Sequence, residues 1–471
     1  MTEPATTESN PKISPYNTGI FVVQCVTIVL AVAAYGAVDP IAQSILSILA
    51  FVLIVLWAAE SLQTGELRIS KNSIQFPLIA LIVVGLIQLL PFGSDADPSV
   101  ILNVPAANTL SLDPWATQMF TIRLMIFVVF LAACLTFLNT SGRVRRAVIF
   151  LISFGTLMGF FGVLQKIADP GAIYGLRLTP QALPFGPYVN QHHFAALMVM
   201  LSGPVIGLLV AGKVRRDLLP LLWIAAVMMA VAAFFTGSRG GMLSYAAMTG
   251  FTLFAAGRYR NSDPNDDERT TFSRLLPIAG SAVLGIVILG VAILLGAGGN
   301  LIRGFGLTGG VEDVSSGRLH FWQVALKIFA ENPILGAGLD GFGVAFPFFD
   351  TRNGAFRVEQ AHNEYLQMLA DGGVIGFICV AVFIFLLIKN GLSSMKQAGN
   401  PGDLGIRIGA LAGCIGVLVH SFFDFPLRTA ANGFVFLMLA VIAIQAVASD
   451  TKSNERSSGR SRSRSLSRTT E

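Results

Sequence analysis

Three polar segments of the sequence contain residue types that bind anions or move protons. The first is the segment 237–241, Gly-Ser-Arg-Gly-Gly, in which Ser238 and Gly240 flank Arg239. Glycines let a ligand approach the backbone, and a guanidinium beside a helix N-terminus suits a phosphate group. The alternative is an arginine that extends along an apolar surface to reach water and binds no ligand.

The second segment begins at Ser315 and places Arg318 in the first turn of a predicted helix. Apolar residues recur at three- and four-residue steps, as in an amphipathic helix at a membrane interface: Leu319, Trp322, Leu326 and Phe329. We expect Ser315 or Ser316 to cap this helix and Asn332-Pro333 to end it. Because a helix dipole disfavours a cation in the first turn, Arg318 predicts a bound anion there. A solvated arginine is the alternative.

The third segment, 360–373, is predicted to form a helix ended by Gly372 and Gly373. One face of this helix would carry His362, Leu366 and Leu369. An imidazole can take a proton near neutral pH, so His362 is a candidate general base, although a lone histidine is often structural. The neighbouring Asn363 or Glu364 is a candidate for orienting the loop.

Other residues are weaker candidates for contact with a substrate. Tyr365 and Trp322 have rings that could stack on a sugar, although core packing also accounts for both. Asn190, His193 and Asp424 follow or precede apolar runs and could line the same cavity. Capping of a helix is the alternative function for Asn190.

The composition indicates that these residues are positioned by membrane helices. The chain has 471 residues, of which 54% are hydrophobic and 13% charged, and its mean hydropathy is +0.68. Soluble domains contain about 25% charged residues. The apolar runs are continuous and long enough to span a bilayer, which excludes alternating barrel strands. The net charge of +5 is spread over short loops and does not indicate nucleic acid, and the four cysteines form no metal-binding pattern.

Twelve spans are predicted, near 18–37, 41–59, 74–91, 117–138, 147–166, 193–211, 218–236, 240–257, 275–296, 373–389, 405–423 and 430–448. Lysine and arginine concentrate in the loops after even-numbered spans, whereas the connector 92–115 contains neither. Because basic loops remain in the cytoplasm, we expect both termini there.

We therefore expect an all-α polytopic membrane protein with about twelve transmembrane helices and one long extracytoplasmic loop. Its predicted parts are a polar cytoplasmic N-terminus at 1–17, spans one to nine within 18–296, the loop at 297–373, spans ten to twelve within 374–448, and a disordered basic cytoplasmic tail at 449–471. This topology places Arg239, Arg318 and His362 on the outer face, where they would share one pocket.

The order of the motifs resembles the O-antigen ligase and Wzy polymerase superfamily. The resemblance rests on Gly-Ser-Arg-Gly-Gly at 237–241, Arg-x-x-x-Trp at 318–322, Asn-Pro-x-x-Gly-x-Gly at 332–338 and Ala-His-Asn-x-Tyr-Leu at 361–366, and it extends over about 190–425. It implies a GT-C-like, inverting glycosyltransferase of the bacterial inner membrane that needs no metal ion or other cofactor.

The resemblance also implies the substrates. The donor is a glycan linked to undecaprenyl diphosphate, and the acceptor is a glycan or lipid A-core. Membrane lipids are expected as further partners, and nucleic acid is not. By position, Arg239 and Arg318 match the arginines that hold the diphosphate, and His362 matches the histidine near the acceptor hydroxyl. The segments Gly-Ser-Arg-Gly-Gly at 237–241 and His-Asn-Glu-Tyr at 362–365 favour a ligase. The alternative is a Wzy-type polymerase of O-antigen or exopolysaccharide.

Two other classes of function remain as alternatives. A transporter or lipid flippase would carry ionisable residues deep in several spans, whereas the predicted spans are nearly free of charge at their centres. A non-catalytic assembly partner would keep its function when the candidate site is mutated.

Overall fold

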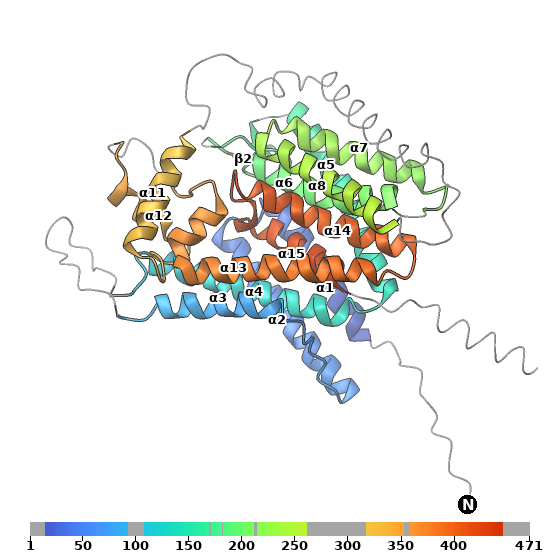
Figure 1. Cartoon of the computed structure of the whole chain (residues 1–471), viewed down its shortest axis with the longest axis horizontal. Coiled ribbons are helices and arrows are strands. Elements are labelled where there is room, and N and C mark those ends of the chain that lie inside the picture. The colour runs from blue at the N-terminus through green and yellow to red at the C-terminus, as the bar shows by residue number, and fades with distance from the viewer. Residues whose placement is uncertain are drawn as a thin grey trace, which may run out of the picture.

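The protein is built from α-helices that run mostly along one direction. The computed structural model describes residues 15–92, 108–168, 171–180, 182–211, 214–260, 317–352 and 358–445. The helices of the bundle are α1 (Pro15–Ala33), α2 (Pro40–Thr64), α3 (Gln75–Gln88), α4 (Pro114–Phe137), α5 (Ser141–Ala168), α6 (Gln191–Ala211), α7 (Leu219–Phe235), α8 (Arg239–Arg260), α13 (Glu364–Lys396), α14 (Pro401–His420) and α15 (Ala430–Ile444). Figure 1 shows them as one bundle.

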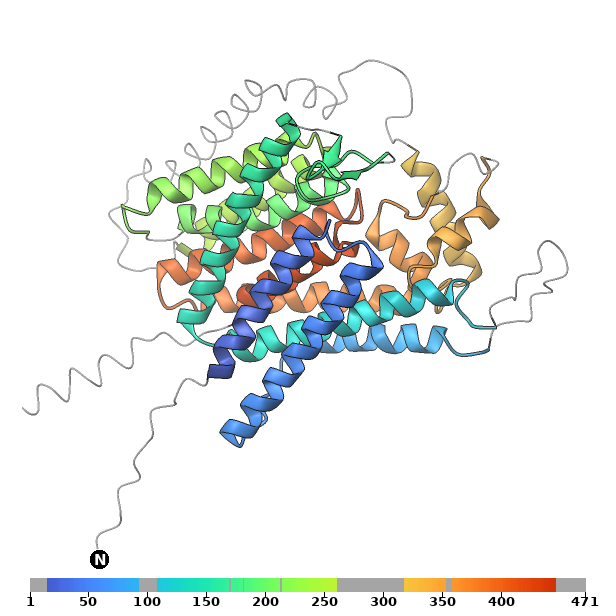
Figure 2. The same ribbon diagram turned by 180° about the vertical axis from the view of Figure 1, so that it is seen from behind.

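The shorter elements lie at one end of the bundle. They are α11 (Arg318–Glu331), α12 (Phe342–Phe349), the 3-10 turn η3 (Pro426–Arg428) and a hairpin of strands β1 (Ala172–Ile173) and β2 (Arg177–Leu178). The strands pair antiparallel, with Ala172 opposite Leu178. Figure 1 shows α11 and α12 together at one end of the bundle, and Figure 2 shows α1 and α2 crossing the opposite face obliquely.

The long helices confirm a multi-pass, all-α membrane protein. Within the described residues, seven helices are long and apolar enough to cross a membrane: α1, α2, α4, α5, α6, α13 and α14. The apolar helices α3, α7 and α15 are shorter. The predicted span at 275–296 and the tail at 449–471 lie outside the described residues, whereas each other predicted span coincides with a helix. The number of twelve spans therefore stays a prediction.

Helix α6 lies at the centre of the bundle, packed on α14 and α8. Of its most apolar stretch, 83% is buried. Glycines make the close contact with α14 possible: a Cβ atom at Gly409 would meet the carbonyl oxygen of Gly203, and one at Gly203 would meet that of Gly409. Because α6 and α8 begin at the end of the bundle where α14 finishes, this packing brings three helix termini together.

A small unit that we call the head, residues 317–352 and 358–363, contains α11 and α12. It has its own apolar core, which includes Val324, Ile328, Phe342 and Phe346. Gln88 at the end of α3 ties the head to the bundle, because its amide group donates to the carbonyl oxygen of Leu335 (2.5 Å) and accepts from the N–H of Leu339 (2.9 Å).

Glycines let the head lie against α13. Gly336 has a φ of 71°, and a side chain there would meet the backbone of Asp371. At Gly373 the backbone leaves the helical region (φ 61°, ψ −163°), so α13 is two helices joined at a kink. The kink coincides with the predicted boundary at 373 between the long loop and the tenth span.

Candidate active site

A cavity of about 300 Å³ lies where α5, α6, α8 and α11 meet the loop between α14 and η3. The polar and charged side chains in its wall include Lys166, His192, Ser238, Arg239, Arg318 and Asp424. These residues come from positions far apart in the sequence. The packing of α6, α8 and α14 therefore creates a polar cavity at one end of an otherwise apolar bundle.

The turn before α8 presents Arg239 to this cavity. Ser238 precedes the helix as its cap, and its Oγ accepts a hydrogen bond from the N–H of Gly241 at 3.1 Å. Gly240 lies against the imidazole of His420, where a Cβ atom would be 3.0 Å from Cδ2. The turn thus brings the backbone of α8 and the exposed side chain of Arg239 to the same wall.

Three helix N-termini meet at the cavity: those of α6, α8 and α11. Asn190 caps α6, because its Oδ1 accepts a hydrogen bond from the N–H of His192 at 2.8 Å. Helix α11 begins at Arg318, and the capping position is Gly317, which makes no side-chain cap bond. The serines at 315 and 316 that were predicted to cap it lie outside the described residues. Each N-terminus contributes partial positive charge, which favours an anion.

The cavity wall carries an excess of positive charge. Lys166 at the end of α5 joins Arg239 and Arg318, whereas Asp424 is the one carboxylate among the described residues that line the cavity. An Nη atom of Arg318 lies 3.9 Å from Oδ2 of Asp424. Together with the helix N-termini, these cations suit a ligand that carries more than one negative charge.

His362 and Asp424 form a hydrogen-bonded pair beside the cavity. Nδ1 of His362 lies 3.1 Å from Oδ1 of Asp424. Burial alone would raise the pKa of Asp424, but the hydrogen bond from His362 and the electrostatic effect of the neighbouring imidazoles of His192, His193 and His362 hold it well below its usual range. Because an ionised carboxylate only accepts, Nδ1 of His362 carries a proton, and in the neutral imidazole Nε2 keeps its lone pair. His362 is therefore arranged as a proton acceptor.

The structure places His362 before α13 and not within it. Asn363 caps the helix, accepting hydrogen bonds from the N–H groups of Tyr365 and Leu366 at 3.1 Å. His362 has a φ of 51°, a conformation that is uncommon for residues other than glycine. The prediction that His362 shares a helix face with Leu366 and Leu369 is therefore wrong. The left-handed turn directs the imidazole towards Asp424, with Phe425 against it at 5.0 Å between ring centroids.

Some predicted site residues do not line the cavity. Tyr365 donates to the carbonyl oxygen of Leu418 (2.7 Å) and lines a separate, mostly apolar cavity of about 150 Å³ between α3, α4, α13 and α15. Trp322 lines neither cavity. Asn190 and Asn363 serve as helix caps. Ser238, Gly240, Arg239, Arg318 and Asp424 do line the cavity of about 300 Å³.

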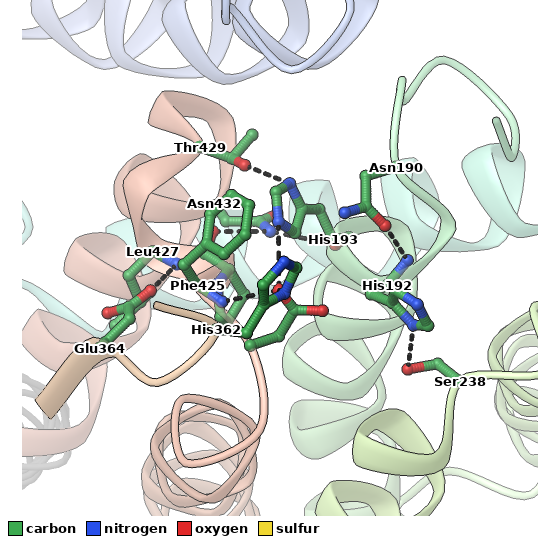
Figure 3. A network of polar contacts seen from close by, with 12 residues as sticks. Asn190, His192, His193, Ser238, His362, Glu364, Phe425, Leu427, Thr429 and Asn432 are labelled. Atoms are coloured by element: carbon green, nitrogen blue, oxygen red, sulfur yellow. Dashed lines mark hydrogen bonds and ion pairs between the residues drawn. The ribbon is translucent and has the colours of Figure 1, made fainter. Parts of the chain in front are cut away.

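Sequence reasoning missed Lys166 and His192. Lys166 stands at the outer end of the predicted fifth span, where a lysine is unusual under the positive-inside rule, and that was an available signal. His192 is a neighbour of Asn190 and His193, which were both singled out. Figure 3 shows how the two histidines diverge: His192 turns to Ser238, whereas His193 turns to Thr429 and its Nε2 lies 3.9 Å from Asp424.

The fold and the site together define a helical membrane protein with a positively charged cavity beside a His–Asp pair. The family profile of the O-antigen ligases matches residues 224–381. The resemblance to the O-antigen ligase and Wzy polymerase family is therefore confirmed over the stretch from α7 to α13, which contains Arg239, Arg318 and His362. His192 and Asp424 lie outside it. No match was found among curated proteins. This similarity points to transfer or polymerisation of glycans in a membrane.

Proposed function

We propose that the chain transfers a glycan from undecaprenyl diphosphate to an acceptor hydroxyl at the periplasmic face of the bacterial inner membrane. The observation that carries the proposal is the cavity in which Lys166, Arg239 and Arg318 meet three helix N-termini beside the His362–Asp424 pair. Such a cavity has the charge to hold a diphosphate, and the neighbouring imidazole has the free nitrogen to accept a proton.

In this proposal the diphosphate of the donor occupies the cavity. The bond between the anomeric carbon and the diphosphate oxygen breaks, and its electron pair leaves with the diphosphate, whose negative charge increases. Arg239, Arg318 and Lys166 stabilise this charge in place of a metal ion. Loss of one donor aimed at developing charge costs about 2.7–4 kcal/mol in enzymes.

The acceptor hydroxyl attacks the anomeric carbon from the side opposite the diphosphate. Because the attack comes from that side, the configuration at the anomeric carbon inverts. The proton of the hydroxyl passes to Nε2 of His362 as the new glycosidic bond forms. Asp424 holds the imidazole in the required tautomer and stabilises the imidazolium that results. General base catalysis of this kind contributes about 10²–10⁴-fold.

Reconstitution of the full chain in lipid vesicles tests the proposal. The donor is an undecaprenyl-diphosphate-linked glycan, offered with either lipid A-core or a second lipid-linked glycan as acceptor. We expect a single addition to lipid A-core. A ladder of products on the second acceptor assigns the polymerase alternative, and movement of the donor across the bilayer without transfer assigns a flippase. Activity that persists in the His362→Ala variant contradicts the proposed base.

A further inference from the structure

His192 and Ser238 form a hydrogen-bonded pair in the wall of the candidate active-site cavity. Nδ1 of His192 lies 2.9 Å from Oγ of Ser238. The backbone of His192 is fixed by the cap of α6, because its N–H donates to Oδ1 of Asn190 at 2.8 Å. The ring is half-buried, and it lines the same cavity as Arg239 and Arg318. Figure 3 shows this pair on the opposite side of His362 from Glu364 and Leu427.

Hydrogen-bond accounting decides which nitrogen of His192 carries the proton. Ser238 is fully buried, so its hydroxyl hydrogen needs an acceptor. Its Oγ already accepts from the N–H of Gly241, and among the described residues Nδ1 of His192 is the acceptor within reach. Ser238 therefore donates to Nδ1, and the neutral imidazole carries its hydrogen on Nε2. The chain of bonds runs from Gly241 through Ser238 to His192.

We propose that His192 is a further catalytic residue, which donates a hydrogen bond from Nε2–H to a diphosphate oxygen of the donor. The inference rests on the proposed function, because it requires a diphosphate in the cavity. The donated bond strengthens as the bond to the anomeric carbon breaks and charge moves onto the diphosphate. Ser238 is its positioning residue: the same hydroxyl that caps α8 also fixes the tautomer that presents Nε2–H.

The His192–Ser238 pair and the His362–Asp424 pair have different roles in the proposed reaction. Asp424 is an acceptor, so it leaves Nε2 of His362 free to take a proton. Ser238 acts as a donor, so it leaves Nε2 of His192 able to give a hydrogen bond. The two imidazoles are thus set in opposite tautomers on the two sides of the reacting centre, one towards the acceptor and one towards the leaving group.

Two substitutions of His192 separate the proposed bond from a role in folding. The His192→Asn variant keeps a polar group near Nδ1 that can bond to Ser238, but it loses the donor at Nε2. The His192→Gln variant carries an amide N–H that can reach the position of Nε2. We expect His192→Asn to lower kcat by about 10²–10³-fold, the range for one lost donor to developing charge. We expect the kcat of His192→Gln to be at least tenfold higher than that of His192→Asn.

Nitrogen NMR of the wild-type chain labelled with [¹⁵N]histidine gives a readout that does not depend on activity. We expect the resonances of His192, assigned by their loss in His192→Asn, to show a protonated Nε2 and an unprotonated Nδ1. Addition of inorganic pyrophosphate should shift Nε2. In Ser238→Ala the preference for this tautomer should disappear.

The outcomes distinguish this inference from the proposed function. Wild-type kcat in His192→Asn, or a protonated Nδ1 in the wild-type chain, overturns the assignment of His192. If Arg239→Ala and Arg318→Ala nevertheless lower the rate of transfer, the proposed function survives although the role of His192 does not. If those two variants also transfer at the wild-type rate, both proposals fail together. If His192→Asn does not fold, the resonances are assigned with His192→Gln instead, and the tautomer of His192 and its response to pyrophosphate test the assignment.

Discussion

Nδ1 of His362 lies 3.1 Å from Oδ1 of Asp424, although 62 positions separate the two residues in the sequence. The carboxylate is 2% exposed and the imidazole 29%, so the pair joins a buried charge to a ring that solvent or substrate can reach. A second bond fixes the carboxylate, because the same oxygen accepts from the N–H of Phe425 at 2.9 Å. The turn after α14 therefore sets the orientation of the candidate base.

The first prediction concerns the tautomer of His362. In Asp424→Asn the amide can turn its NH₂ group towards Nδ1, which would move the imidazole proton to Nε2 and block proton acceptance. We expect kcat for glycan transfer to fall by about 10²–10⁴-fold, while the KM for the donor changes little. Steady-state kinetics of the reconstituted chain measures both. Asp217→Asn is the control, because Asp217 is an exposed partner of Arg215; a kcat equal to that of the control would refute the role of Asp424.

The second prediction concerns the contribution of Arg318 in the cavity to the rate of transfer. Arg318→Ala removes the whole group and should lower kcat by about 10²–10³-fold. Arg318→Lys keeps the charge but loses the planar fork, so a smaller loss is expected. Arg215→Ala, on an exposed loop, should have no effect. Kinetics at several donor concentrations gives the comparison. Equal losses in the alanine and lysine variants would show that the fork, and not the charge, decides the rate.

The third prediction concerns metal ions. In the proposed mechanism Lys166, Arg239 and Arg318 stabilise the negative charge of the diphosphate, so transfer should continue in the presence of EDTA. The measurement is the initial rate of the reconstituted chain with EDTA and after addition of Mg²⁺ or Mn²⁺. Loss of activity with EDTA that a single divalent ion restores would contradict the metal-free mechanism.

Much of the fold follows directly from the sequence. Helices such as α6 and α14 were predictable because a bilayer requires long apolar runs in which the backbone bonds to itself. The kink at Gly373 was signalled by two adjacent glycines. Topology predicted that Arg239, Arg318 and His362 share one pocket. Arg239 and Arg318 do line one cavity, whereas His362 is not among its lining residues and is joined to it through Asp424.

Other features of the site depend on details that hydropathy does not carry. His362 was assigned to a helix because its spacing to Leu366 fits a helical period, but Asn363 caps α13 and leaves His362 in a left-handed turn. Lys166 and His192 reach the cavity only through the packing of α5 and α6 against their neighbours. Contacts of that kind are set by tertiary structure, which a single sequence does not specify locally.

The fourth prediction concerns the ion pairs that join the head to the bundle. Arg428 donates to Asp340 in the head and to Asp371 in α13, the latter at 2.6 Å. Burial opposes the charge on Arg428, but Asp371 and Asp340 raise its pKa above the ordinary value. Arg428→Met would leave both carboxylates without this partner, at a cost of about 3–5 kcal/mol.

Thermal unfolding in detergent measures this loss of stability. Adding Asp371→Asn and Asp340→Asn to Arg428→Met removes the uncompensated charges, so we expect the triple variant to recover part of the lost stability. A triple variant less stable than Arg428→Met would show that the carboxylates stabilise the fold through other contacts.

The fifth prediction compares two glycines in helices of the bundle, Gly409 in α14 and Gly250 in α8. A Cβ atom at Gly409 would meet the carbonyl oxygen of Gly203 and lie 2.7 Å from Cα of Pro204, whereas one at Gly250 meets no atom within 4 Å. Backbone atoms cannot yield as a flexible side chain can, so Gly409→Ala must push α14 away from α6, at a cost of about 1–3 kcal/mol or more. Gly250→Ala should be neutral or gain up to about 1 kcal/mol from higher helix propensity.

Both effects can be measured by thermal unfolding, and transfer activity adds a second test. Helix α6 carries His192 near its start, and α14 leads directly to Asp424, so a change in the spacing of these helices alters the cavity itself. We therefore expect Gly409→Ala to lower kcat even at temperatures where the variant stays folded, whereas Gly250→Ala transfers at the wild-type rate. A folded Gly409→Ala variant with wild-type kcat would show that the site does not depend on the close contact between α6 and α14.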